Sequence, residues 1–363
     1  SLVFVNGEEH RRHRRVINPA FHRSFPLDKI GGCVNTLLDI VQRRIDASPS
    51  PSTPIPMGDL VRRLTVELLG HILLDYDFEA LTEKEGDLFV LFEQVLKDFF
   101  NPVFFLVPFL DRIGLRPAAH KRAAHLIDEL MRVVDIKREQ IAQLRAAGQF
   151  EEAERRMDLL QLIVEANTAL AGEEGNVKGP VLSDIEVRHN MFALYFAGLD
   201  NTSSGIGASM FMLAKYPEIQ ERARREVLEV LGGEGATDGQ ITTPLQGDLR
   251  QMHYLEAVVR EALRMYPPPG TVPDRVLTQE MEFDGHILPV GTSVGVNIRP
   301  VQYDPVAWPE PTKFDPERFL DEEGHVRPRN DGSFVLFGLG SRQCIGMQMA
   351  FTEMKVTLAM MLK

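Results

Sequence analysis

The stretch Phe337-Gly-Leu-Gly-Ser-Arg-Gln-Cys-Ile-Gly346 places one cysteine, Cys344, among glycines and just ahead of an apolar run. A thiolate in such a place can act as a nucleophile, as a redox centre, or as the single protein ligand of a metal. The residues after Cys344 predict a helix, which puts the cysteine at the helix N-terminus. Unpaired N–H groups and the positive end of the helix dipole stabilise a negative sulfur there.

The number of cysteines favours the metal ligand among these three uses. Structural zinc and iron–sulfur clusters need about four protein ligands, mostly thiolates. This chain has two cysteines, and the other, Cys33, lies near the opposite end. One thiolate without companions therefore indicates a metal that brings its own equatorial ligands, which means haem. The plain alternative is a buried glycine-rich turn with an incidental cysteine.

The spacing within this stretch is the more specific observation. Its fixed positions, Phe337-x-x-Gly340-x-Arg342-x-Cys344-x-Gly346, resemble the haem-binding signature of the cytochrome P-450 superfamily at every place. Glycines leave room where a large flat ligand must approach the backbone. A guanidinium such as that of Arg342 suits a carboxylate. The resemblance implies haem b bound in this loop, with Cys344 as the ligand of its iron.

Composition limits the class of protein. A hydrophobic content of 44% and a charged content of 25% predict a globular protein with a sizeable core. A net charge of -12 argues against nucleic acid as a partner. Two distant cysteines predict a reducing compartment without disulfides, with Cys33 as a core residue.

Membrane and leader segments are not predicted within the sequence. The most apolar stretch, Phe99–Leu110, has twelve residues and two prolines, against roughly 20 apolar residues for a spanning helix. No signal peptide precedes the first helical pattern. The chain begins at Ser1 and stops inside an amphipathic pattern at Lys363, so we expect it to be cut at both ends.

The order of sequence patterns predicts a mainly helical α+β fold. Turn-forming residues mark loops at 47–56, 171–180 and 232–247. Helical periodicity is clear over Leu60–Leu74 and Ala119–Arg145, whereas strand-like pieces come late, at Met281–Pro289 and Thr292–Ile298. The resemblance implies the P-450 fold, with a long central helix and a small β region, as a single domain over residues 1–363.

A long helix is predicted to begin at Ser183. Ser183-Asp-Ile-Glu186 is a capping box, and the helical pattern that it opens need not stop before Pro217. The middle reads Ala197-Gly-Leu-Asp-Asn-Thr-Ser-Ser204, a polar interruption that we expect to loosen the hydrogen-bond ladder locally. A buried acid there can relay protons; the alternative is a polar face at a domain surface.

This interruption resembles the oxygen-activating segment of the family, Ala/Gly-Gly-x-Asp/Glu-Thr-Thr/Ser. The matching residues are Ala197, Gly198, Asp200 and Thr202. Asn201 departs from the pattern, because the family usually has a threonine there. Asparagine both donates and accepts hydrogen bonds, so it can replace threonine in part. Thr202 lies about 100° further round the helix and is not expected to substitute. The resemblance implies that Asp200, with Asn201 or Thr202, manages protons.

A structural brace is predicted further along the chain. Glu261-Ala-Leu-Arg264 places an acid and a base at i, i+3 on one helix face, which alone indicates no more than a solvated ion pair. Its order before Phe314-Asp-Pro-Glu-Arg-Phe319 and the cysteine loop is similar to the family's Glu-x-x-Arg helix and Pro-Glu-Arg-Phe segment. The resemblance implies that Glu261, Arg264 and Arg318 form one network beneath the loop.

The densest basic run is His10-Arg-Arg-His-Arg-Arg15. It can be a solvated helix face or, in principle, a nucleic-acid patch. It resembles the family helix that carries Trp-x-x-x-Arg, with His10 in place of the tryptophan and Arg14 as a contact to a haem propionate. Arg275 and Arg342 match further propionate contacts. The other arginines of the run can dock an acidic electron donor.

The resemblance implies a eukaryotic, membrane-anchored monooxygenase. It would insert one oxygen atom from O2 into a small lipophilic substrate, with electrons from NADPH through NADPH–cytochrome reductase and with cytochrome b5 as a possible second partner. It would sit at the cytoplasmic face of the endoplasmic reticulum membrane through a segment absent from this sequence. Phe99–Leu110 then fits the substrate entrance, though core packing explains it equally well.

Two other functions remain open from the sequence. The first is an O2-independent haem-thiolate isomerase or lyase that acts on a peroxide, and Asn201 is the residue that favours it. The second is a haem-binding remnant without catalytic activity.

Overall fold

The structure is a computed structural model that describes the chain except residues 49, 51–52, 83–85, 100, 108, 113, 151–157, 174–180, 233–241, 328 and 330. The predicted loops at 47–56, 171–180 and 232–247 fall partly on residues outside that description. The chain divides into two compact units, Ser1–Leu199 and Asp200–Lys363, and each is described by itself. The expectation of a single domain stays a prediction.

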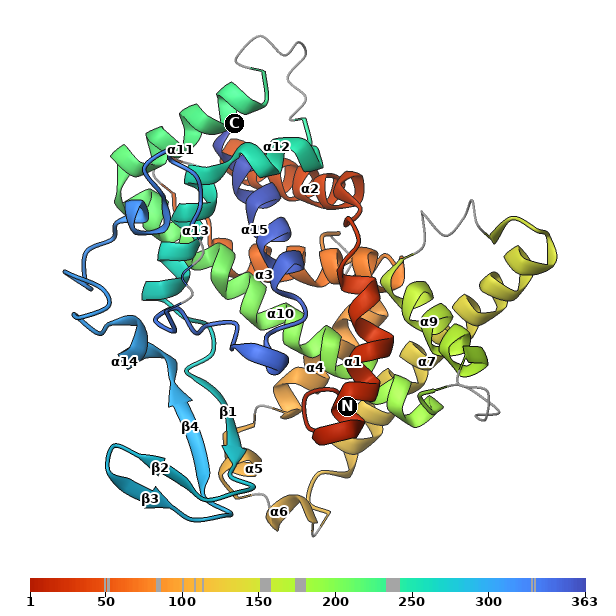
Figure 1. Cartoon of the computed structure of the whole chain (residues 1–363). Coiled ribbons are helices and arrows are strands. Elements are labelled where there is room, and N and C mark those ends of the chain that lie inside the picture. The colour runs from red at the N-terminus through yellow and green to blue at the C-terminus, as the bar shows by residue number, and fades with distance from the viewer. Residues whose placement is uncertain are drawn as a thin grey trace. The chain divides into compact units, whose positions relative to one another are not determined.

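The first unit is built from helices (Figure 1). They are α1 (Gly7–Phe21), α2 (Leu27–Asp46), α3 (Met57–Leu69), the π-helical turn η1 (Gly70–Leu74), α4 (Asp87–Phe99), α5 (Pro102–Leu106), α6 (Phe109–Arg112), α7 (Pro117–Ala146), α9 (Leu159–Glu173) and the first half of α10 (Asp184–Lys215). Contacts join α1 to α9, α4 to α7 and α2 to α3.

An aromatic cluster marks the core of this unit. The Tyr195 ring lies 5.3 Å from the ring of Phe78 and 4.8 Å from that of Phe92, and its hydroxyl donates to the Val66 carbonyl at 3.1 Å. This bond satisfies the one polar atom of a buried ring, as such rings require. The cluster therefore joins α3, α4 and α10 into one body.

The long helix α10 begins and ends where the sequence predicts. The Ser183 amide donates to the Glu186 carboxylate at 2.9 Å, and the Glu186 amide donates back to the Ser183 hydroxyl at 3.4 Å, which is the expected capping box. The helix ends at Lys215, ahead of Pro217. A Cβ added to Gly198 would lie 2.7 Å from the Leu69 side chain, so a close approach to α3 requires glycine there.

The second unit combines helices with two small antiparallel sheets. Its elements are α11 (Pro217–Val230), α12 (Gln246–Gln251), α13 (His253–Met265), β1 (Thr271–Val276), β2 (Met281–Phe283), β3 (His286–Leu288), β4 (Ser293–Asn297), α14 (Ile298–Gln302), the short 3-10 turns η2 (Pro316–Phe319) and η3 (Gly340–Arg342), and α15 (Met347–Leu362). Helix α13 packs against α11, α15 and η2. The helix-rich class with a small β region is confirmed.

The strand predictions are confirmed for β2, β3 and β4, whereas β1 was not predicted. Strands β2 and β3 form the predicted hairpin, and its two-residue turn has φ of +51° at Asp284 and +75° at Gly285, as a type I′ turn demands. Strand β4 falls within the predicted Thr292–Ile298. Its antiparallel partner β1 was missed, because Pro273 interrupts the strand signal and a bulge breaks the register between Val272 and Arg275. Figure 1 shows β1 beside β4.

Helix α15 carries two buried polar side chains one turn apart, Glu353 and Thr357, each with no exposed area. Within the part of the chain that the structure describes, neither carboxylate oxygen of Glu353 nor the Thr357 hydroxyl has a hydrogen-bond partner. Burial raises the pKa of Glu353 from 4.5 to about 8. The side chain is therefore neutral in the folded protein at neutral pH.

We expect Glu353 to make the folded state less stable as pH rises. The unfolded carboxyl loses its proton near pH 4.5 and the folded one near pH 8, so the unfolding free energy falls across that window. A Glu353→Gln variant should lose this dependence and be more stable than wild type at pH 8 by roughly 2–4 kcal/mol. Urea denaturation from pH 5 to pH 8 measures the difference. The exposed Glu322→Gln change is the control; a parallel pH dependence in Glu353→Gln and wild type would contradict the expectation.

Candidate functional site

The cysteine loop is held by its own backbone. The Cys344 amide donates to the Phe337 carbonyl at 2.7 Å, which closes the ends of the signature on each other. The Gly338 amide donates to Val335 at 2.9 Å, and the Gln343 amide donates to Gly340 at 3.0 Å. These bonds between backbone groups hold the loop.

Two glycines of the loop have a conformation that other residues rarely adopt. Gly338 and Gly340 have φ of +66° and +67°. A Cβ added to Gly340 would meet no atom within 4 Å, so this side of the loop is open. Glycine is therefore required here by backbone conformation and not by crowding.

The helix behind the loop starts later than predicted. Helix α15 begins at Met347 with Gly346 as its N-cap, so Cys344 lies two residues before the cap. A turn at residues 345–346 intervenes, because the Cys344 amide is already bonded to Phe337. The ring of Phe337 packs 5.4 Å from that of Phe351 and so ties the loop to the helix.

The residues of the loop fit a haem. The thiol of Cys344 is exposed, as a metal ligand must be before it is bound. Arg342 is half-buried beside it, and Arg275 is exposed on β1 opposite Val294. An accessible thiol, an open glycine face and cationic side chains match a flat ligand that carries carboxylates.

The polar segment of α10 keeps a regular helix. No break is seen in the described helix, so the predicted local loosening was wrong. The Ser203 hydroxyl donates to the Asp200 carbonyl at 3.2 Å and the Ser209 hydroxyl to the Gly205 carbonyl at 2.8 Å. These side chains satisfy themselves on their own helix, and the ladder continues past them.

The candidate proton-handling residues occupy different faces of α10. Ala197, Asn201 and Ser204 are exposed at i, i+4 and i+7, which is one stripe. Asp200 is half-buried, as is Gly198. Thr202 is buried, with 3% exposure. Asn201 and Thr202 therefore face apart, as predicted, and Thr202 is not on the exposed stripe.

The predicted network of Glu261, Arg264 and Arg318 is present in the second unit, and its role as a brace for the cysteine loop stays a prediction. Two bonds join Arg264 to Glu261, Nε to Oε2 at 2.6 Å and Nη2 to Oε1 at 2.8 Å, and neither side chain is exposed. Arg318 Nε lies 3.4 Å from Glu261 Oε1, and the Asp315 amide donates to the same oxygen at 3.0 Å. Burial raises the pKa of Glu261, and the bonds from Arg264 oppose that rise.

Two residues of the brace were not predicted. The backbone carbonyl of Gln302 accepts a hydrogen bond from Arg264 Nη1 at 2.8 Å. The side-chain amide of Gln302 donates to the backbone carbonyl of Arg264 at 2.9 Å. The Trp308 ring lies 5.2 Å from the Arg264 guanidinium and 4.3 Å from that of Arg329. Trp308 is the single tryptophan of the chain, and that was the one feature of the sequence that could have pointed to it.

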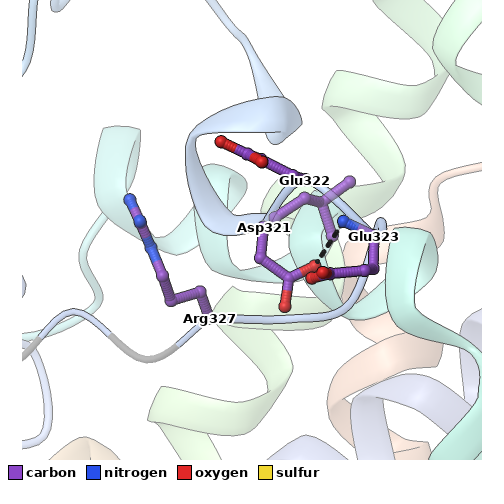
Figure 2. Close-up of a pocket in the computed structure, with 5 residues that line it drawn as sticks. Asp321, Glu322, Glu323 and Arg327 are labelled. Carbon is purple, nitrogen blue, oxygen red and sulfur yellow. Dashed lines mark hydrogen bonds between the residues drawn. The ribbon is translucent and has the colours of Figure 1, made fainter.

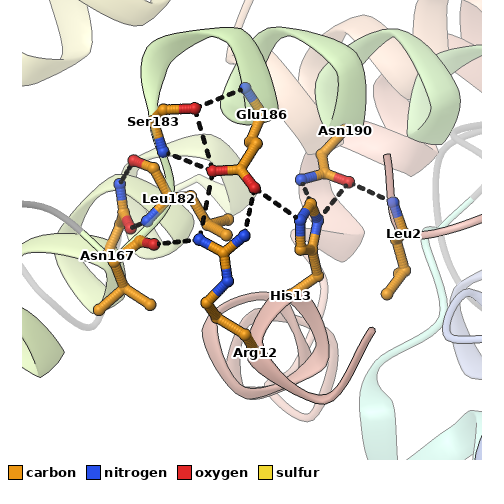
Figure 3. Close-up of polar contacts among 9 residues, drawn as sticks. Leu2, Arg12, His13, Asn167, Leu182, Ser183, Glu186 and Asn190 are labelled. Atoms are coloured by element: carbon orange, nitrogen blue, oxygen red, sulfur yellow. Dashed lines mark hydrogen bonds and ion pairs between the residues drawn. The ribbon is translucent and has the colours of Figure 1, made fainter. Parts of the chain in front are cut away.

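The basic run on α1 is only partly solvated, so the alternative of a fully solvated helix face does not hold. Figure 3 shows Arg12 and His13 turned toward the start of α10. Arg12 donates to the Val181 carbonyl at 2.7 Å and pairs with Glu186. His13, without exposure, lies between Asn190 and Glu186, with its Nε2 3.3 Å from the Glu186 carboxylate.

Arg12 and His13 both contact the Glu186 carboxylate. Its burial opposes ionisation, but bonds from Ser183 and the Arg12 guanidinium lower its pKa to about 2. The candidate propionate residue Arg14 is half-buried on the same helix, and His10 is buried. Within the first unit, the side chains of Arg12, His13 and Glu186 therefore join α1 to α10.

A separate hollow of about 450 Å³ lies at the turn after η2 (Figure 2). It is lined by Leu320, Asp321, Glu322, Glu323 and Arg327. The Asp321 carboxylate accepts the amides of Glu323 at 3.1 Å and His325 at 2.7 Å, so its function is to close the turn. We assign no ligand to this hollow.

The apolar stretch Phe99–Leu110 is not explained by core packing. Phe99, Val103, Val107 and Phe109 are 50%, 54%, 46% and 63% exposed. Residues 100 and 108 lie outside the described part. Among the helices that the structure describes, none combines the length and the hydropathy needed to cross a bilayer.

The second cysteine, Cys33, is buried as predicted for a core residue. Burial raises the pKa of its thiol to about 12.

Comparison with known proteins agrees with this geometry. A family model described as Cytochrome P450 matches residues 1–363. Cytochrome P450 4A10 of Rattus norvegicus is 32% identical over 99% of this chain and 68% of its own length. Cytochrome P450 4A24 of Sus scrofa is 31% identical over the same shares, and Cytochrome P450 4F11 of Homo sapiens 29% over 99% and 67%. The chain belongs to the cytochrome P450 family.

The family defines the fold and the activity. The chain is a haem-thiolate monooxygenase of the microsomal type with the P-450 fold, and it uses haem b with NADPH-derived electrons supplied through a reductase. Its substrates are lipophilic, and its microsomal relatives point to association with the endoplasmic reticulum membrane. Nothing in the comparisons favours the isomerase, the lyase or the non-catalytic remnant.

Proposed function

We propose that Cys344 is the residue that would hold the haem iron through its thiolate, in a single P-450 domain that spans residues 1–363. The observation that carries the proposal is the exposed thiol at the end of a loop closed by the 2.7 Å bond from Cys344 to Phe337. Phe337, Gly340 and Gly346 shape that loop, and Arg342, Arg275 and Arg14 are the contacts for the propionates. When bound, haem supplies O2 activation and transfer of one oxygen atom, favoured by electron density from the thiolate.

The chain's own residues handle protons and position. Ala197, on the exposed stripe with Asn201, presents only a methyl group where substrate and cofactor approach, whereas Gly198 allows the close approach to Leu69. Asp200 is the acidic side chain of the segment that relays protons, and the exposed amide of Asn201 orients water for that relay. Thr202 is buried and acts as a packing residue.

The redox partners are NADPH–cytochrome reductase and cytochrome b5, with the catalytic domain at the cytoplasmic face of the membrane. Support comes from exposed cationic side chains such as Arg11 and Arg15 on α1, which suit acidic electron donors. The exposed apolar side chains between Phe99 and Phe109 support a substrate entrance near the lipid surface. A chain reconstituted with both partners is the system for testing this.

The direct test is turnover with purified NADPH–cytochrome reductase, ¹⁸O2 and a panel of lipophilic substrates. We expect one labelled oxygen atom in the product for each NADPH used productively. Turnover of a lipid hydroperoxide without NADPH, and none with NADPH and O2, would instead establish the isomerase. Haem binding with no NADPH oxidation under any of these conditions would establish the non-catalytic remnant.

Asn201→Thr is expected to improve coupling. Threonine at this exposed position restores the hydroxyl of the family segment, so a larger share of NADPH should yield product and a smaller share peroxide. We expect the peroxide formed per NADPH to fall by about threefold, which corresponds to roughly 0.65 kcal/mol of discrimination. Peroxide and NADPH assays measure it, with Ser204→Thr on the same stripe as the control. Equal leakage in wild type and Asn201→Thr would mean that asparagine is fully competent.

A further inference from the structure

Three metal-ligating side chains meet at the end of α3 in the first unit. Glu67 lies in the last turn of α3, His71 follows one turn later in η1, and Asp77 lies in the segment that returns. One ligand atom from each falls within 4.8 Å of the others. His71 Nε2 is 3.5 Å from Glu67 Oε1. None of the three belongs to the haem site.

The local fold explains why the chain returns to this point. The π-helical turn widens the helix, and Asp75 then reverses the chain with φ of +50°. The Tyr76 amide donates to the Gly70 carbonyl at 3.1 Å. A Cβ on Gly70 would lie 2.5 Å from both the Phe78 ring and the Tyr76 carbonyl, so only glycine allows this close crossing. Such π-helical turns occur often at functional sites.

Backbone donors hold the two carboxylates in place. Glu67, with 5% exposure, accepts the Phe78 amide at 2.9 Å on one oxygen and the Ala80 amide at 2.7 Å on the other. Asp77 accepts the Glu79 amide at 2.7 Å. Each oxygen keeps a second lone pair for another partner. Hydrogen bonds behind the ligands are the usual way in which a protein orients a metal site.

The cluster brings two carboxylates and one imidazole to the same point. Lys29, on α2, pairs with Asp75 and not with either ligand carboxylate. A divalent cation between the three side chains would offset the charge of two neighbouring carboxylates.

We propose that Glu67, His71 and Asp77 form a binding site for a divalent transition-metal ion of the zinc class. One imidazole nitrogen and two carboxylate oxygens favour zinc-like ions over Mg²⁺ and Ca²⁺, which prefer all-oxygen sites. With metal–ligand distances of about 2.0–2.2 Å, donor atoms at neighbouring tetrahedral corners lie roughly 3.5 Å apart. The 3.5 Å between His71 and Glu67 matches that spacing. Water completes the ion's ligands from the exposed side of Asp77.

The two other comparable clusters of described residues do not fit an ion as well. In the group Glu9, His13 and Glu186, the Arg12 guanidinium already occupies the Glu186 carboxylate and both ring nitrogens of His13 are engaged. In the group Asp321, Glu323 and His325, the Asp321 carboxylate closes its own turn. Charge and prior bonding therefore favour the Glu67 site.

The test is calorimetric titration of chelator-treated holoenzyme with Zn²⁺ and, separately, Mg²⁺. We expect one Zn²⁺ to bind per chain, and Mg²⁺ to bind at least 100-fold more weakly. His71→Ala and Asp77→Asn should each weaken Zn²⁺ binding by at least tenfold. His71 and Asp77 are both at least partly exposed, so these variants leave the hydrogen bonds of the buried Glu67 carboxylate to Phe78 and Ala80 in place.

A matched control is available on α7. His125 and Glu129 are also at i, i+4, with Nδ1 and Oε1 3.8 Å apart, but no third ligand joins them among the described residues. His125→Ala should leave Zn²⁺ binding unchanged. Equal Zn²⁺ affinity in wild type, His71→Ala and Asp77→Asn would overturn the proposal. So would an equal loss in His125→Ala, or the absence of one-to-one binding in wild type.

Discussion

Replacing Cys344 by alanine is expected to abolish monooxygenase activity and the thiolate-specific absorption of the reduced, carbon-monoxide-bound protein. The substitution removes the sulfur atom of an exposed residue. The loop bond from residue 344 to Phe337 runs through the backbone, so it survives. Activity should fall by at least 1000-fold, while the unfolding free energy without haem changes by less than about 0.5 kcal/mol, as for an ordinary surface change.

Cys33→Ala is the matched control for this experiment. Cys33 is buried and its pKa is raised to about 12, so it carries no thiolate. Its removal costs some core packing but should leave the spectrum of the bound haem intact. If the spectrum is unchanged in Cys344→Ala, or lost in Cys33→Ala, the assignment of the ligand is wrong.

Arg264→Ala is expected to lower the unfolding free energy by about 3–5 kcal/mol, because the buried Glu261 carboxylate loses both bonds from Arg264 and keeps only the more distant Arg318 and the Asp315 amide. Arg264 also donates to the Gln302 carbonyl at 2.8 Å, and it lies against Trp308. The loss should therefore release the segments on both sides of α14. Denaturation by urea, followed by circular dichroism, measures the effect.

An exposed pair with the same spacing shows how much of this effect comes from burial. Arg132 pairs with Glu129 at i, i+3 on α7 with an N–O distance of 2.9 Å, but the arginine side chain is 72% exposed. Arg132→Ala should cost less than about 1 kcal/mol. A similar small cost for Arg264→Ala would mean that the brace adds little to stability.

Features that depend on neighbouring residues were predictable from the sequence. The capping box at Ser183 and the pair of Glu261 with Arg264 follow from spacings of three residues. The glycines of the cysteine loop follow from a fixed pattern. In each case the partners lie within a few positions, so a linear pattern captures them.

Features that depend on distant segments were not predictable in this way. Strand β1 exists because β4 pairs with it, across a bulge that no local signal announces. Gln302 reaches Arg264 from 38 positions away. The alternative of a solvated face for the basic run does not hold, because Arg12 pairs with Glu186, 174 positions further along the chain. The cluster of Glu67, His71 and Asp77 needs the reversal at Asp75, which the helical pattern of Leu60–Leu74 conceals.

The geometry of the brace also has a consequence for biosynthesis. The Glu261 carboxylate accepts a hydrogen bond from the Asp315 amide, which is 54 residues further along the chain. Because the ribosome delivers the N-terminal part first, α13 emerges with its acid and base still hydrated. The ion pair can be sealed from water only after Gln302 and Asp315 have followed. Cys344 emerges later still, so the order of translation allows the scaffold to close before the haem ligand is made.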